Sequence, residues 1–93
     1  MPIDTFLNLL KSIVDKNKPL VYLRFNETIW TVSDLYIYKD IVYLHTGTLH
    51  KLTIRDIATY LLDHKSIYRV RIVIPTGGYK DIKDISNTGY LYV

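Results

Sequence analysis

The chain contains no cysteine, and this absence excludes disulfide bonds, thiolate nucleophiles, iron–sulfur clusters and cysteine-based zinc sites. It has no apolar run near the roughly 20 residues that a membrane-spanning helix needs. Its first residues do not combine a basic start with an apolar stretch, as a secretory signal does. We therefore expect a cytoplasmic protein with no membrane contact, no metal and no other cofactor.

The net charge is also small, at +3, and 48% of the residues are hydrophobic, which excludes a disordered chain. The 93 residues predict a single domain, residues 1–93. A domain of this size buries only about 60–65% of the surface that its unfolded chain exposes, so its stability margin is thin. Pairing with a copy of itself is an ordinary way to bury more surface, and we expect a homodimer.

The charges are unevenly distributed along the chain. Residues 1–24 sum to +2, residues 25–63 to −2 and residues 64–93 to +3. Two basic ends around an acidic middle favour an anionic partner. The total charge is nevertheless well below that of a dedicated nucleic-acid-binding protein.

Hydrophobic periodicity predicts two helices separated by strands. Apolar residues at three- and four-residue steps predict helices over residues 3–16 and 54–64. Asn17 is expected to cap the first helix in a left-handed conformation, and Thr53 with Asp56 resembles a capping box that begins the second. Alternating apolar residues predict strands over residues 20–25, 28–38, 41–45 and 67–74, with a further short strand over 90–93.

The first hairpin is expected to have a two-residue turn at residues 26–27. The register that follows collects four apolar side chains on one face, which makes a good core set. These are Val21, Leu23, Trp30 and Val32. Tyr22 and Arg24 then lie on the opposite face.

The second hairpin is expected to turn at residues 39–40. Asp34 then faces His45, and Tyr36 faces Tyr43. Lys-Asp is not a favoured type I′ sequence, which leaves a longer turn open. The inward positions before residue 33 are out of step with those after it, so a bulge is expected at Ser33-Asp34.

These elements predict an α+β fold in the order α-β-β-β-α-β, with the short C-terminal strand in addition. The sheet is expected to be mainly antiparallel, with four to five strands. Two helices, each with one apolar stripe, can cover only one face of that sheet. The second face is therefore expected to be open.

Signals for catalysis or metal binding are weak. The three histidines at 45, 50 and 64 show no His-Glu-x-x-His spacing, and His64 is expected to cap a helix C-terminus. An Asp34–His45 pair can orient a general base, but it is equally an ordinary cross-strand pair. An enzyme that uses this pair with Arg69 or Arg71 on a phosphate ester is left open, while a non-catalytic protein is favoured.

The open face gives the strongest functional signal because alternation gathers tyrosines and arginines on it. The predicted binding residues are Tyr22, Arg24, Tyr36, Tyr38, Tyr43, Arg69 and Arg71. Tyrosine and arginine are enriched at protein interfaces, which favours self-association or a protein partner. The alternatives are nucleic acid, with Arg24, Arg69 and Arg71 on phosphates, or tyrosines that merely stabilise the sheet.

The composition resembles that of small proteins encoded by viruses of hot-acid crenarchaea. The resemblance covers the whole chain and consists of twelve isoleucines, nine tyrosines, one glutamate and no cysteine in a short basic sequence. It implies a thermostable viral accessory protein in the host cell interior, where a host protein or nucleic acid would be its partner. No functional residue follows from it, because it includes no diagnostic motif.

Overall fold

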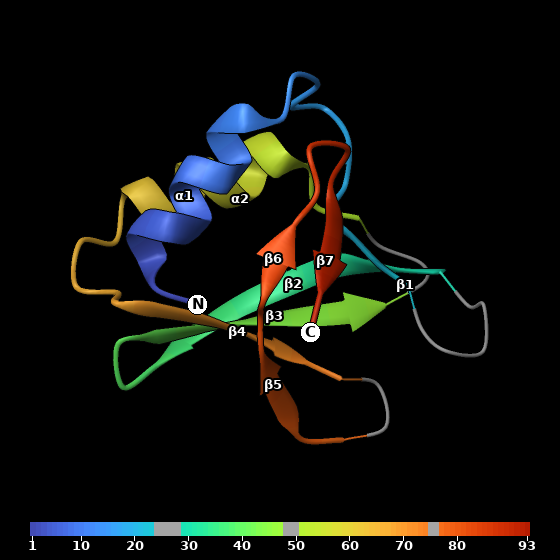
Figure 1. The fold of residues 1–93 in the computed structure, drawn as a ribbon. Helices are drawn as coiled ribbons and strands as arrows, with labels where there is room; N and C mark the ends of the chain where they lie inside the picture. Colours follow the sequence, from blue (N-terminus) through green and yellow to red (C-terminus); the bar gives the residue numbers. More distant parts are fainter. Residues whose placement is uncertain (24–28, 48–50, 75–76) are drawn as a thin grey trace.

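Two helices and a seven-stranded sheet form the computed structural model of the chain, which describes residues 1–23, 29–47, 51–74 and 77–93 (Figure 1). The elements are α1 (Ile3–Ser12), β1 (Val21–Leu23), β2 (Ile29–Tyr38), β3 (Ile41–Gly47), α2 (Ile54–Leu62), β4 (Arg69–Val73), β5 (Tyr79–Asp81), β6 (Asp84–Ile85) and β7 (Tyr90–Tyr92). The order expected from the sequence is correct as far as β4. The strands β5 and β6 were not expected.

The sheet is mixed and curls into a half-barrel, with both helices on the same side of it (Figure 1). Its strand order is β5-β4-β3-β2-β1-β7-β6. The pairs β3–β4 and β1–β7 are parallel, and the other neighbours are antiparallel. The predicted mainly antiparallel sheet of four to five strands is therefore only partly correct. The β3–β4 pair is parallel because α2 connects the two strands as a crossover.

Helix α1 ends four residues earlier than predicted, at Ser12. Ile13 is extended, with φ −79° and ψ 124°, and its side chain is buried in the core. The Lys16 ammonium donates to the carbonyls of Leu10 at 2.7 Å and Lys11 at 2.9 Å, and also to that of Ile13. Lys16 therefore donates to carbonyls at and just beyond the end of the helix, in place of the expected left-handed cap.

Helix α2 begins at the predicted capping box. Thr53 Oγ1 accepts from the Asp56 amide, and the Asp56 carboxylate accepts from the Thr53 amide, both at 3.1 Å. The next amides, of Ile54 and Arg55, donate to the carbonyls of Lys18 at 2.8 Å and Lys16 at 2.9 Å, in the segment that follows α1. The helix ends at Leu62, two residues before its predicted end, and His64 Nδ1 lies 2.7 Å from the Tyr60 carbonyl, so the expected histidine cap is confirmed.

The β2–β3 hairpin has the predicted register. Asp34 pairs with His45 and Tyr36 with Tyr43, and the register shifts between Val32 and Asp34, where the bulge was expected. The turn has two residues, 39 and 40, with φ of +52° and +62°. Both lie in the left-handed region that a type I′ turn requires, so the longer turn is not needed.

The predicted register of β1 on β2 is wrong by one residue. Tyr22 pairs with Trp30, and Val21 pairs with Thr31. A shift of one residue exchanges the faces of a strand. Tyr22 consequently packs against the core instead of lying on the opposite face.

The core lies between the helices and the facing side of the sheet. It unites the apolar faces of both helices with alternate residues of β2, β3 and β4. Its largest fully buried side chains are Phe6, Leu10, Ile13, Leu20, Leu44, Ile54, Ile57, Ile72, Val32, Val42 and Val70. The helices thus cover one face of the sheet, and the outward side chains of β2 to β5 occupy the other.

We predict that Phe6→Ala lowers the free energy of unfolding by about 3–5 kcal/mol, because the ring is fully buried and its loss leaves a cavity. Urea denaturation followed by circular dichroism measures the change. Val14→Ala serves as the control, since the Val14 side chain is 95% exposed and its loss is expected to change stability by less than about 0.5 kcal/mol. Equal effects of the two substitutions would contradict the assignment of the core.

We also predict that Asp40→Gly stabilises the protein by about 1 kcal/mol, because φ at residue 40 is +62°, where a side chain is strained. Thermal unfolding at matched pH gives the comparison. Asp63→Gly is the control, because Asp63 has φ −81° and gains nothing from glycine. A loss of stability in Asp40→Gly would contradict the two-residue turn.

Candidate interaction surface

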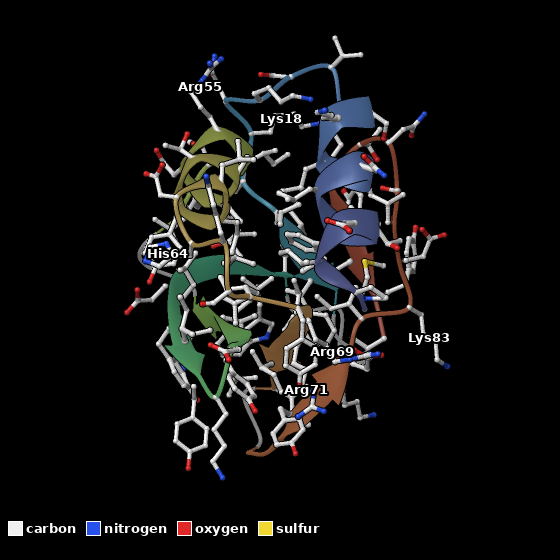
Figure 2. All side chains as sticks on the ribbon, turned by 90° about the vertical axis from the view of Figure 1, so that its left-hand side faces the viewer. Lys18, Arg55, His64, Arg69, Arg71 and Lys83 are labelled. Carbon is white, nitrogen blue, oxygen red and sulfur yellow. The ribbon has the colours of Figure 1, made fainter. Side chains whose placement is uncertain are left out.

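The outward side chains of β2 to β5 form three rows, which we call the open face. Strand pairing fixes each row, because residues in register point to the same side of the sheet. The first row is Asp34, His45, Val73 and Tyr79; the second is Tyr36, Tyr43, Arg71 and Asp81; the third is Tyr38, Ile41 and Arg69. In Figure 2, Arg69 and Arg71 lie beside each other on the part of the sheet away from the helices.

Aromatic rings lie against one another across this face. Tyr36 and Tyr43 are stacked, with ring centroids 5.2 Å apart and planes 17° apart. The His45 ring lies 4.7 Å from Tyr36, and Tyr79 meets Tyr43 edge-on at 5.4 Å. These contacts leave Tyr43 only 7% exposed, whereas Tyr36 is 44% exposed and Tyr79 56%. The open face is therefore an aromatic cluster with a covered centre.

Arg71 is part of this cluster. Its guanidinium carbon lies 4.8 Å from the centroid of the Tyr79 ring, and its Nη1 donates to the Tyr43 hydroxyl at 3.4 Å. That hydrogen bond raises the pKa of the Arg71 guanidinium. The side chain is thus charged and held in place by two tyrosines from neighbouring strands.

Arg69 is held by a carboxylate. Its Nη1 lies 2.8 Å from Asp81 Oδ2, and the other oxygen of Asp81 accepts from the N-terminal ammonium of Met1. That ammonium also donates to the Val70 carbonyl at 3.2 Å. Asp81 therefore joins β5 to β4 and to the start of the chain.

The pKa of Asp81 is lower than the ordinary value for an aspartate. Partial burial alone would raise it, because burial disfavours the charged carboxylate. Hydrogen bonds from the N-terminal ammonium and from Arg69, with their positive charges, outweigh that effect. The carboxylate is therefore stabilised in its ionised form.

Of the seven predicted binding residues, five lie on the open face. They are Tyr36, Tyr38, Tyr43, Arg69 and Arg71. Tyr22 lies on the core side, because β1 pairs with β2 one residue away from the predicted register. Arg24 lies outside the described residues, as does His50, the second of the three histidines.

Sequence reasoning missed Tyr79 and Asp81, which the unexpected strand β5 brings to the open face. A strand of three residues is too short for an alternating pattern to reveal it. The available signal was the Gly77-Gly78 pair between β4 and Tyr79, since glycines that close together favour a hairpin. Both glycines have positive φ, of +108° and +75°.

The geometry gives little support to catalysis by Asp34 and His45. The two residues pair as predicted, but the Asp34 carboxylate accepts from the Leu35 amide at 2.8 Å, and His45 lies against Tyr36. Over residues 1–23, 29–47, 51–74 and 77–93, no three histidine, aspartate or glutamate side chains gather as a metal site would require. The pair is therefore an ordinary part of the open face.

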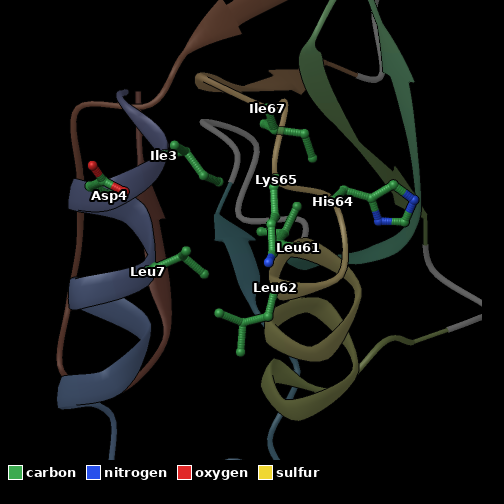
Figure 3. A pocket seen from close by; sticks show the side chains of 8 residues that line it. All are labelled: Ile3, Asp4, Leu7, Leu61, Leu62, His64, Lys65 and Ile67. Atoms are coloured by element: carbon green, nitrogen blue, oxygen red, sulfur yellow. The ribbon is translucent and has the colours of Figure 1, made fainter.

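A separate cavity of about 290 Å³ lies between the helices (Figure 3). Its walls are mainly apolar side chains of α1, α2 and the segment before β4, with three polar side chains among them. The residues that line it are Ile3, Asp4, Leu7, Leu61, Leu62, His64, Lys65 and Ile67. Asp4 and His64 point away from the centre of the cavity in Figure 3, so it offers no pair of groups for acid–base chemistry.

We predict that Asp81→Asn destabilises the protein at neutral pH and not in acid. Because folding lowers the pKa of Asp81, its contribution is complete above the ordinary pKa of about 3.9 and is lost as the pH falls through the folded value. Urea midpoints of the two proteins should therefore differ at pH 7 and converge below about pH 4. Asp84→Asn is the control; a constant difference at all pH values would contradict the ion pairs.

Neither helix in the described part of the chain is long and apolar enough to cross a membrane. Searches with this chain find no matching protein-family model, no matching curated protein and no matching solved structure.

Proposed function

We propose that this protein is a non-catalytic interaction protein that binds a protein partner through the open face, with a homodimer as its working state. The observation that carries the proposal is a group of exposed tyrosines beside two arginines, on a side of the sheet that neither α1 nor α2 covers. Tyr36, Tyr38 and Tyr79 are 44%, 58% and 56% exposed. An exposed apolar patch of this kind is typical of an interaction site.

The cluster is already ordered before any partner binds. Tyr36 stacks on Tyr43, and Arg71 is fixed by Tyr43 and Tyr79. Binding therefore costs little of the side-chain entropy that flexible residues lose at an interface. Large side chains held in one conformation are the usual anchors of protein–protein contacts.

The charges of the open face favour a protein over nucleic acid. Asp34 and Asp81 balance its two arginines, Arg69 and Arg71, so the side chains of its rows sum to zero. The N-terminal ammonium on Asp81 and the Lys39 ammonium beside Tyr38 leave a small positive charge at its border. Arg69 also pairs with Asp81, so a phosphate would have to compete for it. Nucleic-acid affinity comes mainly from uncompensated cations that neutralise phosphates.

The compositional resemblance favours the interior of a virus-infected host cell as the place where the protein would perform this function. The resemblance implies a host protein or nucleic acid as the partner of a small viral accessory protein, and the open face suits the first of these. The partner would then meet the same open face as the second copy does. In this proposal, the homodimer and a host complex are alternative uses of one surface.

We predict a dimer that weakens about tenfold when Tyr38 is changed to serine, because an exposed interfacial tyrosine is a typical hot spot. Sedimentation-velocity experiments over a range of protein concentrations measure the dissociation constant. Tyr90→Ser is the control, since Tyr90 is 39% exposed and lies at the start of β7, next to Gly89, which lies beside Pro19 and Ile54 of α2. A protein that stays monomeric at high micromolar concentration, or an equal effect of both substitutions, would contradict the proposal.

Nucleic acid is the second candidate because Arg71 lies beside tyrosine rings on which bases could stack. If it were the partner, the affinity for single-stranded oligonucleotides would fall steeply with salt and would be lost in Arg71→Gln. We expect no such salt-dependent binding, because the charge of the open face is small and Asp81 already pairs with Arg69. Fluorescence anisotropy with labelled oligonucleotides at several salt concentrations decides between the two.

A further inference from the structure

Tyrosine and arginine occupy different strands of the open face. The outward residues of β2 include Tyr36 and Tyr38, and those of β4 include Arg69 and Arg71. The strand between them, β3, contributes Ile41 and Tyr43, each only 7% exposed. A partner therefore meets a tyrosine column and an arginine column, separated by a strand whose side chains are largely covered.

The two columns share their rows. Tyr36 and Arg71 are both in register with Tyr43, and Tyr38 and Arg69 are both in register with Ile41. A two-fold axis parallel to β3 and lying between two facing copies exchanges β2 with β4 and keeps each row. Tyr38 of one copy then lies over Arg69 of the other, and Tyr36 lies over Arg71.

The other two-fold arrangement is electrostatically worse. An axis at right angles to the strands, through the middle row, keeps each column and places Arg71 opposite Arg71 of the second copy. Like charges placed directly opposite each other are destabilising, whereas an arginine over a tyrosine ring is attractive. The face is therefore complementary to itself in one of the two orientations.

Neighbouring side chains already hold both arginines in place for this contact. Tyr79 lies over the Arg71 guanidinium, with 4.8 Å between the guanidinium carbon and the ring centroid. A planar guanidinium has two faces, and the second can receive a ring of the partner. Asp81 fixes Arg69 in the same way through its hydrogen bond at 2.8 Å. Neither side chain has to be ordered by the partner.

We infer that the partner of the open face is a second copy of this chain, with a two-fold axis parallel to β3 that places the tyrosine column of β2 on the arginine column of β4. The inference rests on the proposed function and specifies the geometry of its dimer. Two sheets packed in this way lie within about 30° of each other, which preserves the row alignment near the centre of the contact.

The size of the contact sets the expected strength of the dimer. Four strands about 4.8 Å apart and three rows about 6.8 Å apart span roughly 20 Å by 20 Å with their side chains. This area is smaller than the roughly 800 Å² per partner of a standard interface. The dimer is therefore expected to dissociate on dilution, and association has to be measured over a range of concentrations.

Single-cysteine variants test the geometry directly, because the natural chain has no cysteine to interfere. Tyr38→Cys and Arg69→Cys are mixed, one of them labelled with nitrogen-15, and treated with a short bismaleimide at a concentration where the protein is dimeric. Mass spectrometry distinguishes linked heterodimers from homodimers. We expect the mixed product to exceed, several-fold, the product of either variant alone.

Two further samples complete the experiment. Tyr36→Cys mixed with Arg71→Cys tests the second row independently, should a variant of the first pair fail to fold by circular dichroism. Arg69→Cys mixed with Val14→Cys gives the background from random collisions, because Val14 is 95% exposed and lies just after α1, in the helix layer. Each variant of a pair retains the tyrosine–arginine contact of the other row, so the dimer is weakened but kept.

The outcomes separate this inference from the proposed function. Self-linked Arg71→Cys as the main product, or equal linking in all mixtures from a protein that sediments as a dimer, overturns the axis and leaves the interaction surface standing. A monomeric natural chain with only background linking overturns both. Preferred linking in both mixed pairs supports the inferred arrangement.

Discussion

The bulge on β2 determines what the open face contains. Before Ser33 the strand directs Val32 into the core, and after it Leu35 and Ile37 point to the core, so the inward positions change parity. Without the extra residue, the second half of β2 would present Tyr36 and Tyr38 to the helices. Gly47 accommodates the bulge, because a side chain there would meet Ser33 Oγ at 3.1 Å and Cβ at 3.3 Å. The half-exposed tyrosine column depends on this local irregularity.

The sequence predicts the register of the β2–β3 hairpin correctly, but it does not predict the register of β1 on β2. In β2 after the bulge, Asp34, Tyr36 and Tyr38 alternate with the aliphatic Leu35 and Ile37, so a slip of one residue would turn Asp34 toward the core and expose the aliphatic side chains. Val21, Tyr22 and Leu23 are three large side chains in succession, and either face of β1 can then turn inward. The alternation there does not specify the register, and Tyr22 was placed on the wrong side for that reason.

The residues of the open face could be predicted where they lie on long strands. Tyr36, Tyr43 and Arg71 follow from alternation within β2, β3 and β4, but their neighbours Tyr79 and Asp81 come from a strand of three residues. The parallel pairing of β3 with β4 depends on where the chain returns after α2, which no local pattern encodes. Yet that pairing aligns arginines with tyrosines in shared rows and gives the surface its chemistry.

The connections between distant parts of the chain bear on how the protein folds. The N-terminal ammonium donates to the Val70 carbonyl and the Asp81 carboxylate, and β1 pairs with β7. Residues near the beginning of the sequence therefore make these contacts only when residues near its end are in place. Such non-local contacts slow folding, because closing the long intervening segments costs chain entropy before the contacts stabilise the structure. The sheet cannot be completed until β7 has left the ribosome, and the unpaired edge of β1 stays exposed during synthesis.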